Sequence, residues 1–178
     1  MPAHSAATAC CSLADEGGGL YRHVNLVRAS ALHIEQDGLF AYSNVTWAAD
    51  YSGFAGAGPS GVVHVKASVT NGGTASGNAC ISFNVTAPDG SLAGSAKASA
   101  PVKVAPGESA TMEAQMVVAS PQLWSSSTPW LYTVAATVED CSGGVVDVVD
   151  TQHGFRHLRY DANDGFFLNK EHFKVRGL

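Results

Sequence analysis

The sequence predicts an all-β protein, built as an antiparallel β-sandwich. Its central part consists of short stretches in which apolar and polar residues alternate with a period of two, the pattern of strands buried on one face. Glycine, proline, asparagine and aspartate separate these stretches at intervals of roughly 8–12 residues, as in sandwich domains. No segment shows the 3.6-residue period of an amphipathic helix, so helices are not expected.

The most regular strand is expected over residues 62–70, and three further strands share its alternation. Turn residues interrupt the chain at 71–73, 88–90, 106–107 and 141–144. Parity predicts the core-facing side chains Val63, Val65, Ala67, Val69, Ile81, Phe83, Val85, Met112, Ala114, Met116, Val118, Tyr132, Val134, Ala136 and Val138.

Three segments are less regular. Residues 31–42 are expected to form a short strand, a turn at 36–38 and a second apolar piece. Residues 53–61 are rich in Gly, Ala and Pro, which predicts a loop. Between residues 92 and 104 alanines dilute the alternation.

Residues 121–132, PQLWSSSTPWLY, predict a corner between two strands. Pro121 and Pro129 cannot donate a backbone hydrogen bond to a sheet, and the serines between them can satisfy their own backbone. A tryptophan side chain is costly to leave in water, so Trp124 is expected to fill the end of the sandwich core.

Length and composition indicate one folded domain with short ends. The 178 residues are 46% hydrophobic and 14% charged, with a formal net charge of -5. No basic stripe is present, so nucleic acid and anionic membranes are not expected as partners. No window reaches the roughly 20 apolar residues of a membrane span. Residues 1–11 lack the basic and apolar regions of a signal peptide, and the cellular compartment stays open.

The cysteines and histidines predict no metal site and no cofactor. Cys10, Cys11, Cys80 and Cys141 lack the paired spacing of a zinc site, so free thiols are expected. Cys80 and Cys141 can form a disulfide only if the fold brings them together. The seven histidines are scattered along the chain, as surface histidines are.

Three stretches of the chain carry distinctive motifs. The corner at 121–132 has the form P-x-L-W-S-x-x-x-P-x-L-Y. The other stretches are GGGLYRHV at 17–24, upstream, and GFR at 154–156 with GFFLN at 165–169 and Arg176-Gly177, downstream. In their motifs, order and spacing the three stretches together resemble glycoside hydrolase family 2, the group of β-galactosidases, β-mannosidases and β-glucuronidases.

The resemblance implies three parts. Residues 1–29 would be the remnant of an N-terminal jelly-roll domain that binds sugar, and residues 30–154 an immunoglobulin-like β-sandwich without the antibody-type disulfide. Residues 155–178 would begin a truncated catalytic (β/α)8 barrel. Residues 10–16 offer no equivalent of the acidic, Arg and Trp residues that family members carry before the glycines, so sugar contacts from that region are not carried over.

The resemblance further implies that the full-length parent hydrolyses terminal β-glycosidic bonds with retention of configuration, in carbohydrate metabolism. That chemistry needs two carboxyl groups facing each other across the sugar. The family takes both from the barrel. In this chain five glutamates occupy turns or solvent-facing strand positions: Glu35, Glu108, Glu113, Glu139 and Glu171. We therefore expect no catalytic, substrate-binding or metal residue here, and a fragment that is inactive alone and meets carbohydrate only through the missing domains.

The alternative is a stand-alone immunoglobulin-like module for binding or adhesion. Residues 165–177 discriminate between the two hypotheses, because a free-standing module has no need of them. Arg156 is expected to pack its stem at a domain junction. Asn44 and Asn84 lie in N-x-Thr acceptor patterns for N-glycosylation, which matter only if the protein is secreted.

Overall fold

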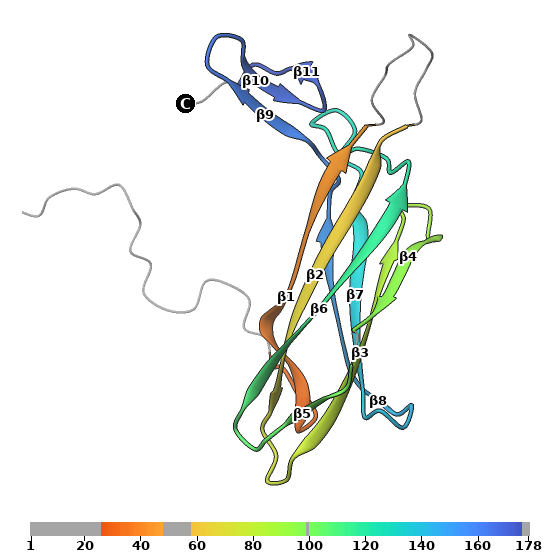
Figure 1. Cartoon of the computed structure of the whole chain (residues 1–178), viewed down its shortest axis with the longest axis vertical. Coiled ribbons are helices and arrows are strands. Elements are labelled where there is room, and N and C mark those ends of the chain that lie inside the picture. Colours follow the sequence, from red (N-terminus) through yellow and green to blue (C-terminus); the bar gives the residue numbers. More distant parts are fainter. Residues whose placement is uncertain (1–25, 48–57, 99, 176–178) are drawn as a thin grey trace, which may run out of the picture.

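Two antiparallel sheets pack face to face, and a small third sheet lies at one end of them (Figure 1). The structure is a computed structural model, and it describes residues 26–47, 58–98 and 100–175. All regular structure in these residues is strand, as predicted. The upstream stretch at 17–24, Cys10, Cys11 and Arg176-Gly177 lie outside the described residues.

The strand order is that of an immunoglobulin-like sandwich. The first sheet has the order β1-β2-β6, and the second has the order β4-β3-β7-β8 with β5 also paired to β3. The third sheet has the order β11-β10-β9. The bounds are β1 Leu32–Thr46, β2 Ser60–Asn71, β3 Gly77–Thr86, β4 Leu92–Lys97, β5 Val102–Val104, β6 Ser109–Ala119, β7 Tyr132–Glu139, β8 Val145–His153, β9 Leu158–Asp161, β10 Gly165–Leu168 and β11 Glu171–His172.

The core lies between the two large sheets, and the alternation in the sequence identified it. The side chains predicted to face inward from β2, β3 and β7 are all buried. On β6, Met112, Met116 and Val118 are buried and Ala114 is half-buried. Each of these strands therefore presents one face to the opposite sheet, which is what a period of two requires.

Tyr132 at the start of β7 fixes the entry into that strand. Its ring is buried, and its hydroxyl oxygen accepts a hydrogen bond from the backbone N–H of Gln122 at 2.9 Å. A tyrosine at this point that bonds back to the upstream backbone is the tyrosine corner of immunoglobulin-like domains. Alternation along β7 predicts Tyr132 as a core residue but gives no sign of this hydrogen bond.

The turn predicted at residues 36–38 is wrong. β1 runs without interruption from Leu32 to Thr46, and its register against β2 shifts between Ile34 and Leu39. Residues 35–38 stand opposite Ser68 alone, and Asp37 takes a positive φ of 57°. The polar segment is accommodated as a β-bulge, which widens one strand locally and leaves the pairing intact on both sides.

The loop predicted over residues 53–61 is wrong at its end. Residues 53–57 lie outside the described part, but Ser60 and Gly61 already belong to β2. A Cβ atom at Gly61 would lie 2.5 Å from Cε1 of Phe155. The glycine is needed for the close approach of an aromatic ring rather than for a turn.

Trp124 does not fill the end of the core, as the sequence suggested. The tryptophan is only half-buried, whereas Phe155 is fully buried. The Phe155 ring lies edge-on to the rings of Tyr132 and His153, with centroids 4.8 and 5.1 Å away. Phe155, which falls just beyond the predicted sandwich, is thus the aromatic plug of this core.

The expectation of free thiols at Cys80 and Cys141 is also wrong, because the two residues form a disulfide. Their Cα atoms are 5.1 Å apart, within the usual range. Cys80 lies on β3 and Cys141 in the β7–β8 turn, so the bond links neighbours of one sheet. It is not the bond between two sheets that antibody domains carry.

Candidate functional site

The corner around Trp124 lies where the sandwich meets the small sheet β9–β11. The backbone N–H of Trp124 donates to the carbonyl of Phe155 at 2.7 Å. The Trp124 carbonyl accepts from Nδ2 of Asn169 at 3.0 Å. One residue of the corner therefore holds both the segment that leaves β8 and the segment that follows β10.

Side-chain contacts strengthen this junction. A Cβ at Gly154 would lie 3.0 Å from Cβ of Trp124, so the glycine lets the Trp124 side chain pack closely against the backbone at 154. The Arg156 guanidinium carbon lies 5.4 Å from the centroid of the Trp124 ring, a cation–π contact on an exposed side chain. Arg156 thus packs at the corner.

Asn169 connects the small sheet to the corner on two sides. Besides its bond to Trp124, its Oδ1 accepts from the backbone N–H of His157 at 3.0 Å, and its own N–H donates to the His157 carbonyl at 2.8 Å. It adopts a positive φ of 53°, which asparagine tolerates better than most residues. In the sequence Asn169 stands out only as part of the GFFLN motif, because its bond to Trp124 joins positions 45 residues apart.

The serine-rich loop satisfies its own backbone, as predicted. Ser125 N–H donates to the Thr128 carbonyl at 3.0 Å, and Thr128 N–H donates to Oγ of Ser125 at 3.0 Å. The hydroxyls of Ser125 and Thr128 lie 2.7 Å apart. These bonds close the loop at residues 125–128 on itself.

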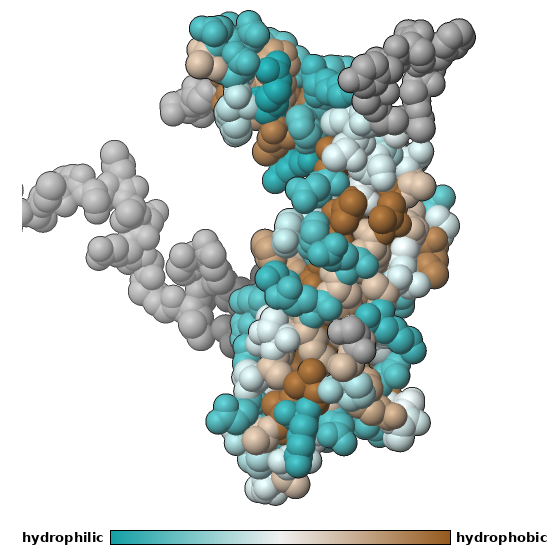
Figure 2. Space-filling model, in the orientation of Figure 1, coloured by the Kyte–Doolittle hydropathy of each residue, from teal (hydrophilic) through white to brown (hydrophobic). Residues whose placement is uncertain are grey.

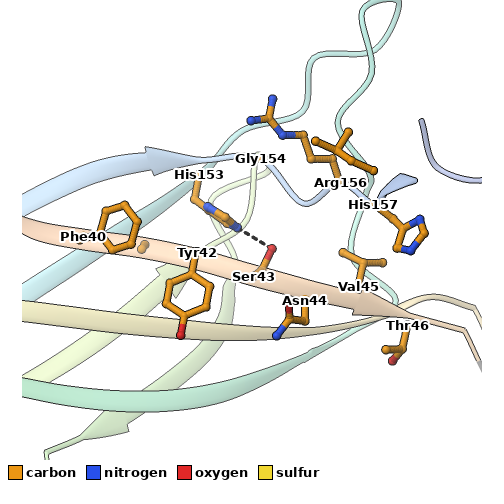
Figure 3. A pocket seen from close by; sticks show the side chains of 12 residues that line it. Phe40, Tyr42, Ser43, Asn44, Val45, Thr46, His153, Gly154, Arg156 and His157 are labelled. Carbon is orange, nitrogen blue, oxygen red and sulfur yellow. Dashed lines mark hydrogen bonds between the residues drawn. The ribbon is translucent and has the colours of Figure 1, made fainter. Parts of the chain in front are cut away.

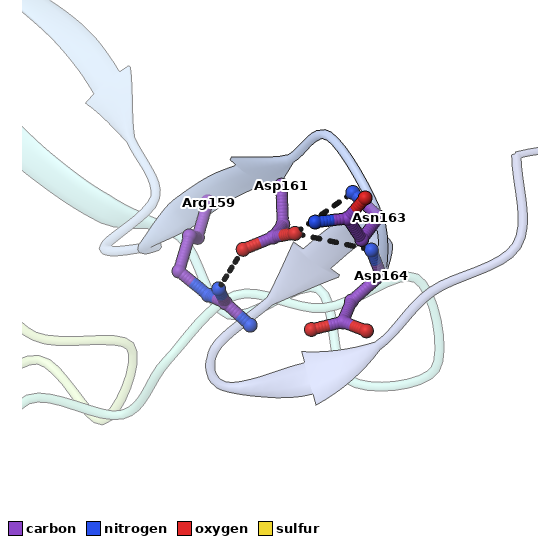
Figure 4. Close-up of polar contacts among 4 residues, drawn as sticks. All are labelled: Arg159, Asp161, Asn163 and Asp164. Atoms are coloured by element: carbon purple, nitrogen blue, oxygen red, sulfur yellow. Dashed lines mark hydrogen bonds and ion pairs between the residues drawn. The ribbon is translucent and has the colours of Figure 1, made fainter.

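The small sheet is built around a capped turn (Figure 4). One carboxylate oxygen of Asp161 accepts from the backbone N–H groups of Asn163 and Asp164 at 3.0 and 3.1 Å, and the other pairs with Arg159 at 2.9 Å. The bond from Asp164 is the largest cause that lowers the pKa of Asp161. Gly165 follows with a φ of 86°, a value that glycine adopts readily in a turn.

Each carboxyl group of the described residues whose pKa is shifted has a lowered pKa. A general acid needs the opposite, a raised pKa. A hydrogen bond from Ser109 lowers the pKa of Glu35, and bonds from Ser91 and Ser142 lower those of Asp89 and Asp140. Asp89 and Asp140 cap turns, and Glu35 connects β1 to β6, the two strands on either side of β2.

The remaining glutamates lie at the surface or the strand ends. Glu113 pairs with Lys66 at 2.7 Å across β6 and β2 and raises the pKa of that lysine. Glu108 and Glu171 are exposed, and Glu139 is half-buried at the end of β7. Asn44 and Asn84, the two glycosylation candidates, are exposed on β1 and β3.

The part of the chain that the structure describes contains neither a metal-binding cluster nor a membrane-spanning helix. Among residues 26–47, 58–98 and 100–175, no group of three or more His, Cys, Asp or Glu side chains is placed to hold a metal ion. Within the same residues no helix has the length and apolar character needed to cross a membrane.

The fold and the junction define an immunoglobulin-like β-sandwich bound at one end to the start of a further segment. Residues 52–156 match the family model described as glycosyl hydrolases family 2. The chain belongs to this family.

Individual relatives cover most of the chain. It is 25% identical over 163 residues to a β-glucuronidase of Formosa agariphila, with 90% of the chain and 16% of the relative aligned. It is 26% identical over 165 residues to a β-galactosidase of Bacteroides ovatus, with 91% of the chain and 18% of the relative aligned. The chain therefore spans less than a fifth of the length of these two relatives.

Solved structures share the fold. A β-glucuronidase of Bacteroides uniformis superimposes with a TM-score of 0.69 at 24% identity, over 84% of this chain and 17% of that one. A family 2 member from Bacteroides cellulosilyticus gives a TM-score of 0.69 at 23% identity, over 84% and 19%.

Proposed function

We propose that this chain is an architectural, non-catalytic part of a family 2 glycoside hydrolase, and that the parent protein hydrolyses terminal β-glycosidic bonds with retention. The observation that carries the proposal is the junction at Trp124. The backbone of this one residue binds both Phe155 and Asn169. A sandwich that fixes the segment after it in this way can hold a following domain in a defined orientation.

The small sheet supports this role, because it leaves apolar surface uncovered. Tyr160 and Phe166 have ring centroids 4.9 Å apart, and Phe166 and Phe173 are 5.9 Å apart. Tyr160 is 79% exposed and Val175 68% exposed. Figure 2 shows brown, apolar patches among the hydrophilic residues of this end of the molecule. Three short strands bury too little to be stable alone, so a neighbouring domain is expected to cover them.

The proposal keeps the three-part division at residues 1–29, 30–154 and 155–178. In it, Phe155 and Asn169 tether the third part to the second. A stand-alone binding module would gain nothing from this tether, which is why the fragment hypothesis is preferred over the alternative.

The state of the carboxyl groups supports the non-catalytic assignment. A retaining glycosidase needs a proton donor of raised pKa and a carboxylate nucleophile about 5–5.5 Å from it. Here the pKa shifts of Glu35, Asp89, Asp140 and Asp161 are all downward. The names of the relatives point to β-glucuronides or β-galactosides as the parent's substrates.

Activity assays test the non-catalytic role. The purified chain should leave aryl β-glucuronide, β-galactoside and β-mannoside at the background rate. Turnover that survives repurification and disappears when one carboxylate of this chain is changed to its amide would refute the assignment.

The architectural role is tested separately by amide hydrogen exchange. Asn169→Ala should speed exchange in β9–β11, because the tether to Trp124 is lost, while β2, β3 and β7 keep their protection. Asn163→Ala is the matched control, since its side chain makes no bond to the corner. Equal exchange in the two variants would show that the tether holds nothing in place.

A further inference from the structure

A cleft of about 910 Å³ runs along the edge strand β1 toward the small sheet. Phe40, Tyr42 and Asn44 line it from β1, and His153, Arg156 and His157 line it from the end of β8 and the segment that follows (Figure 3). The cleft adjoins the junction described above, because Arg156 and His157 belong to both. None of its lining residues is an aspartate or a glutamate, although the whole chain carries 15 acids and a net charge of -5.

The fixed charge of the cleft is positive. Among the described residues no carboxylate lies within ion-pair distance of Arg156, whose guanidinium carbon lies 5.4 Å from the centroid of the Trp124 ring. The Arg156 charge also acts on a neighbouring side chain. Burial is the larger cause that lowers the pKa of His153, and the Arg156 charge is the smaller one. An arginine that forms no ion pair within the described residues, beside a cleft lined by no acidic residue, complements an anion. Its planar guanidinium suits a carboxylate.

The other wall offers flat apolar rings. Phe40 is 59% exposed and Tyr42 is 40% exposed, and their ring centroids are 5.8 Å apart. One face of Tyr42 stacks on His64 at 4.6 Å, so the ring is held in place. Exposed aromatic rings beside hydrogen-bonding groups suit ligands with one apolar and one polar face. The amide of Asn44 and the hydroxyl of Thr46 supply such groups on the same side of β1.

We propose that this cleft binds an acidic oligosaccharide, with sugar rings stacked on Phe40 and Tyr42 and a uronate carboxylate bound by Arg156. A pyranose ring has an apolar C–H face and a polar rim. A uronate also has a carboxylate, whose negative charge can pair with the arginine. The volume admits more than one sugar unit, as in ordinary ligand clefts. This site would hold a glycan chain away from the reacting bond, so it goes beyond the architectural role proposed above.

The test compares two tetrasaccharides by titration calorimetry on the purified 178-residue chain. One is a β-1,4-linked glucuronan tetrasaccharide and the other is cellotetraose, which has the same backbone without the carboxylates. The glucuronan should bind about tenfold more tightly, since a hydrogen bond to a charged group contributes that much. The difference should shrink as salt is added. Equal affinity for the two sugars, or no binding of either, would overturn the proposal.

Variants assign the two walls. Arg156→Gln should remove the tenfold preference and leave cellotetraose binding unchanged. Phe40→Ala should weaken both sugars alike, and its exposed position makes a folding defect unexpected. Lys103→Gln on β5 removes one positive charge outside the cleft and is the matched control. A loss of preference in Lys103→Gln equal to that in Arg156→Gln would show general charge attraction and refute the site. Because these readouts are binding constants, the inference and the proposed lack of catalysis fail independently.

Discussion

Gly61 and Phe155 are predicted to be strongly coupled in stability. A Cβ at position 61 would lie 2.5 and 2.6 Å from two carbons of the Phe155 ring. The ring cannot move aside easily, because it is fully buried against Tyr132. Overpacking of this kind costs about 1–3 kcal/mol, so Gly61→Ala should lower the free energy of unfolding by about 2 kcal/mol.

The sign of that effect should reverse when the ring is removed. Phe155→Ala alone should cost about 3–5 kcal/mol, as for other fully buried phenylalanines. In that background the added methyl group has space, and alanine is favoured over glycine within a strand by roughly 0.5–1 kcal/mol. The coupling free energy between the two positions is therefore expected to be about 2.5 kcal/mol.

Urea unfolding of the wild type, both single variants and the double variant measures this coupling. Gly72→Ala is the control, since the nearest atom to its added Cβ would be 3.8 Å away, and it should change stability little. If Phe155→Ala does not fold, Phe155→Leu can replace it with a smaller expected coupling. Single-variant effects that add to within about 0.5 kcal/mol would show that Gly61 and Phe155 are not in contact.

Three further predictions concern the sandwich. Reduction of the Cys80–Cys141 disulfide should lower the free energy of unfolding by about 4 kcal/mol, because the bond closes a loop of 61 residues, and urea midpoints with and without reductant measure this. Burial and Arg156 lower the pKa of His153, so the unfolded chain binds its proton more readily. The stability that comes from keeping His153 neutral in the folded state is present above its ordinary pKa of 6.5 and is lost as pH falls below that value. His153→Asn should flatten this dependence of the free energy of unfolding on pH. Asn71→Ala should cost about 2 kcal/mol in thermal or urea unfolding, because the Asn71 side chain satisfies the buried carbonyl of Val104 at 3.0 Å.

Alternation identified the strands of this sandwich because one face of each is buried. β2 is the clearest case, since Val63, Val65, Ala67 and Val69 all lack exposed surface. The period of two is a local property of the chain, so no partner need be known to recognise it. The turns at 88–90, 106–107 and 141–144 were equally local, because Pro, Asp and Gly carry their backbone preferences with them.

Long-range contacts were not predictable in the same way. The sequence predicts a loop residue at Gly61, because the group that requires a glycine there, the ring of Phe155, is far away in the sequence. The bulge at 35–38 depends on the register against β2, and the disulfide depends on the pairing of β3 with β7. The size of Trp124 predicts that it is buried in the core. Size does not say which of the two aromatic residues near this corner, Trp124 or Phe155, is enclosed.

Two of the three stretches on which the family resemblance depends, the corner and the described part of the downstream stretch, meet at one place in the structure. The Pro121–Tyr132 corner supplies the Trp124 backbone, the Gly154–Arg156 stretch lies against the Trp124 side chain, and Asn169 binds its carbonyl. Each of these contacts needs a particular residue: a glycine at 154 for close approach, and an amide at 169 to bond in two directions. Trp124 therefore belongs in the sequence pattern because it joins two parts of the chain. A residue with that task is half-buried at a boundary, and its replacement should loosen the small sheet more than it destabilises the core.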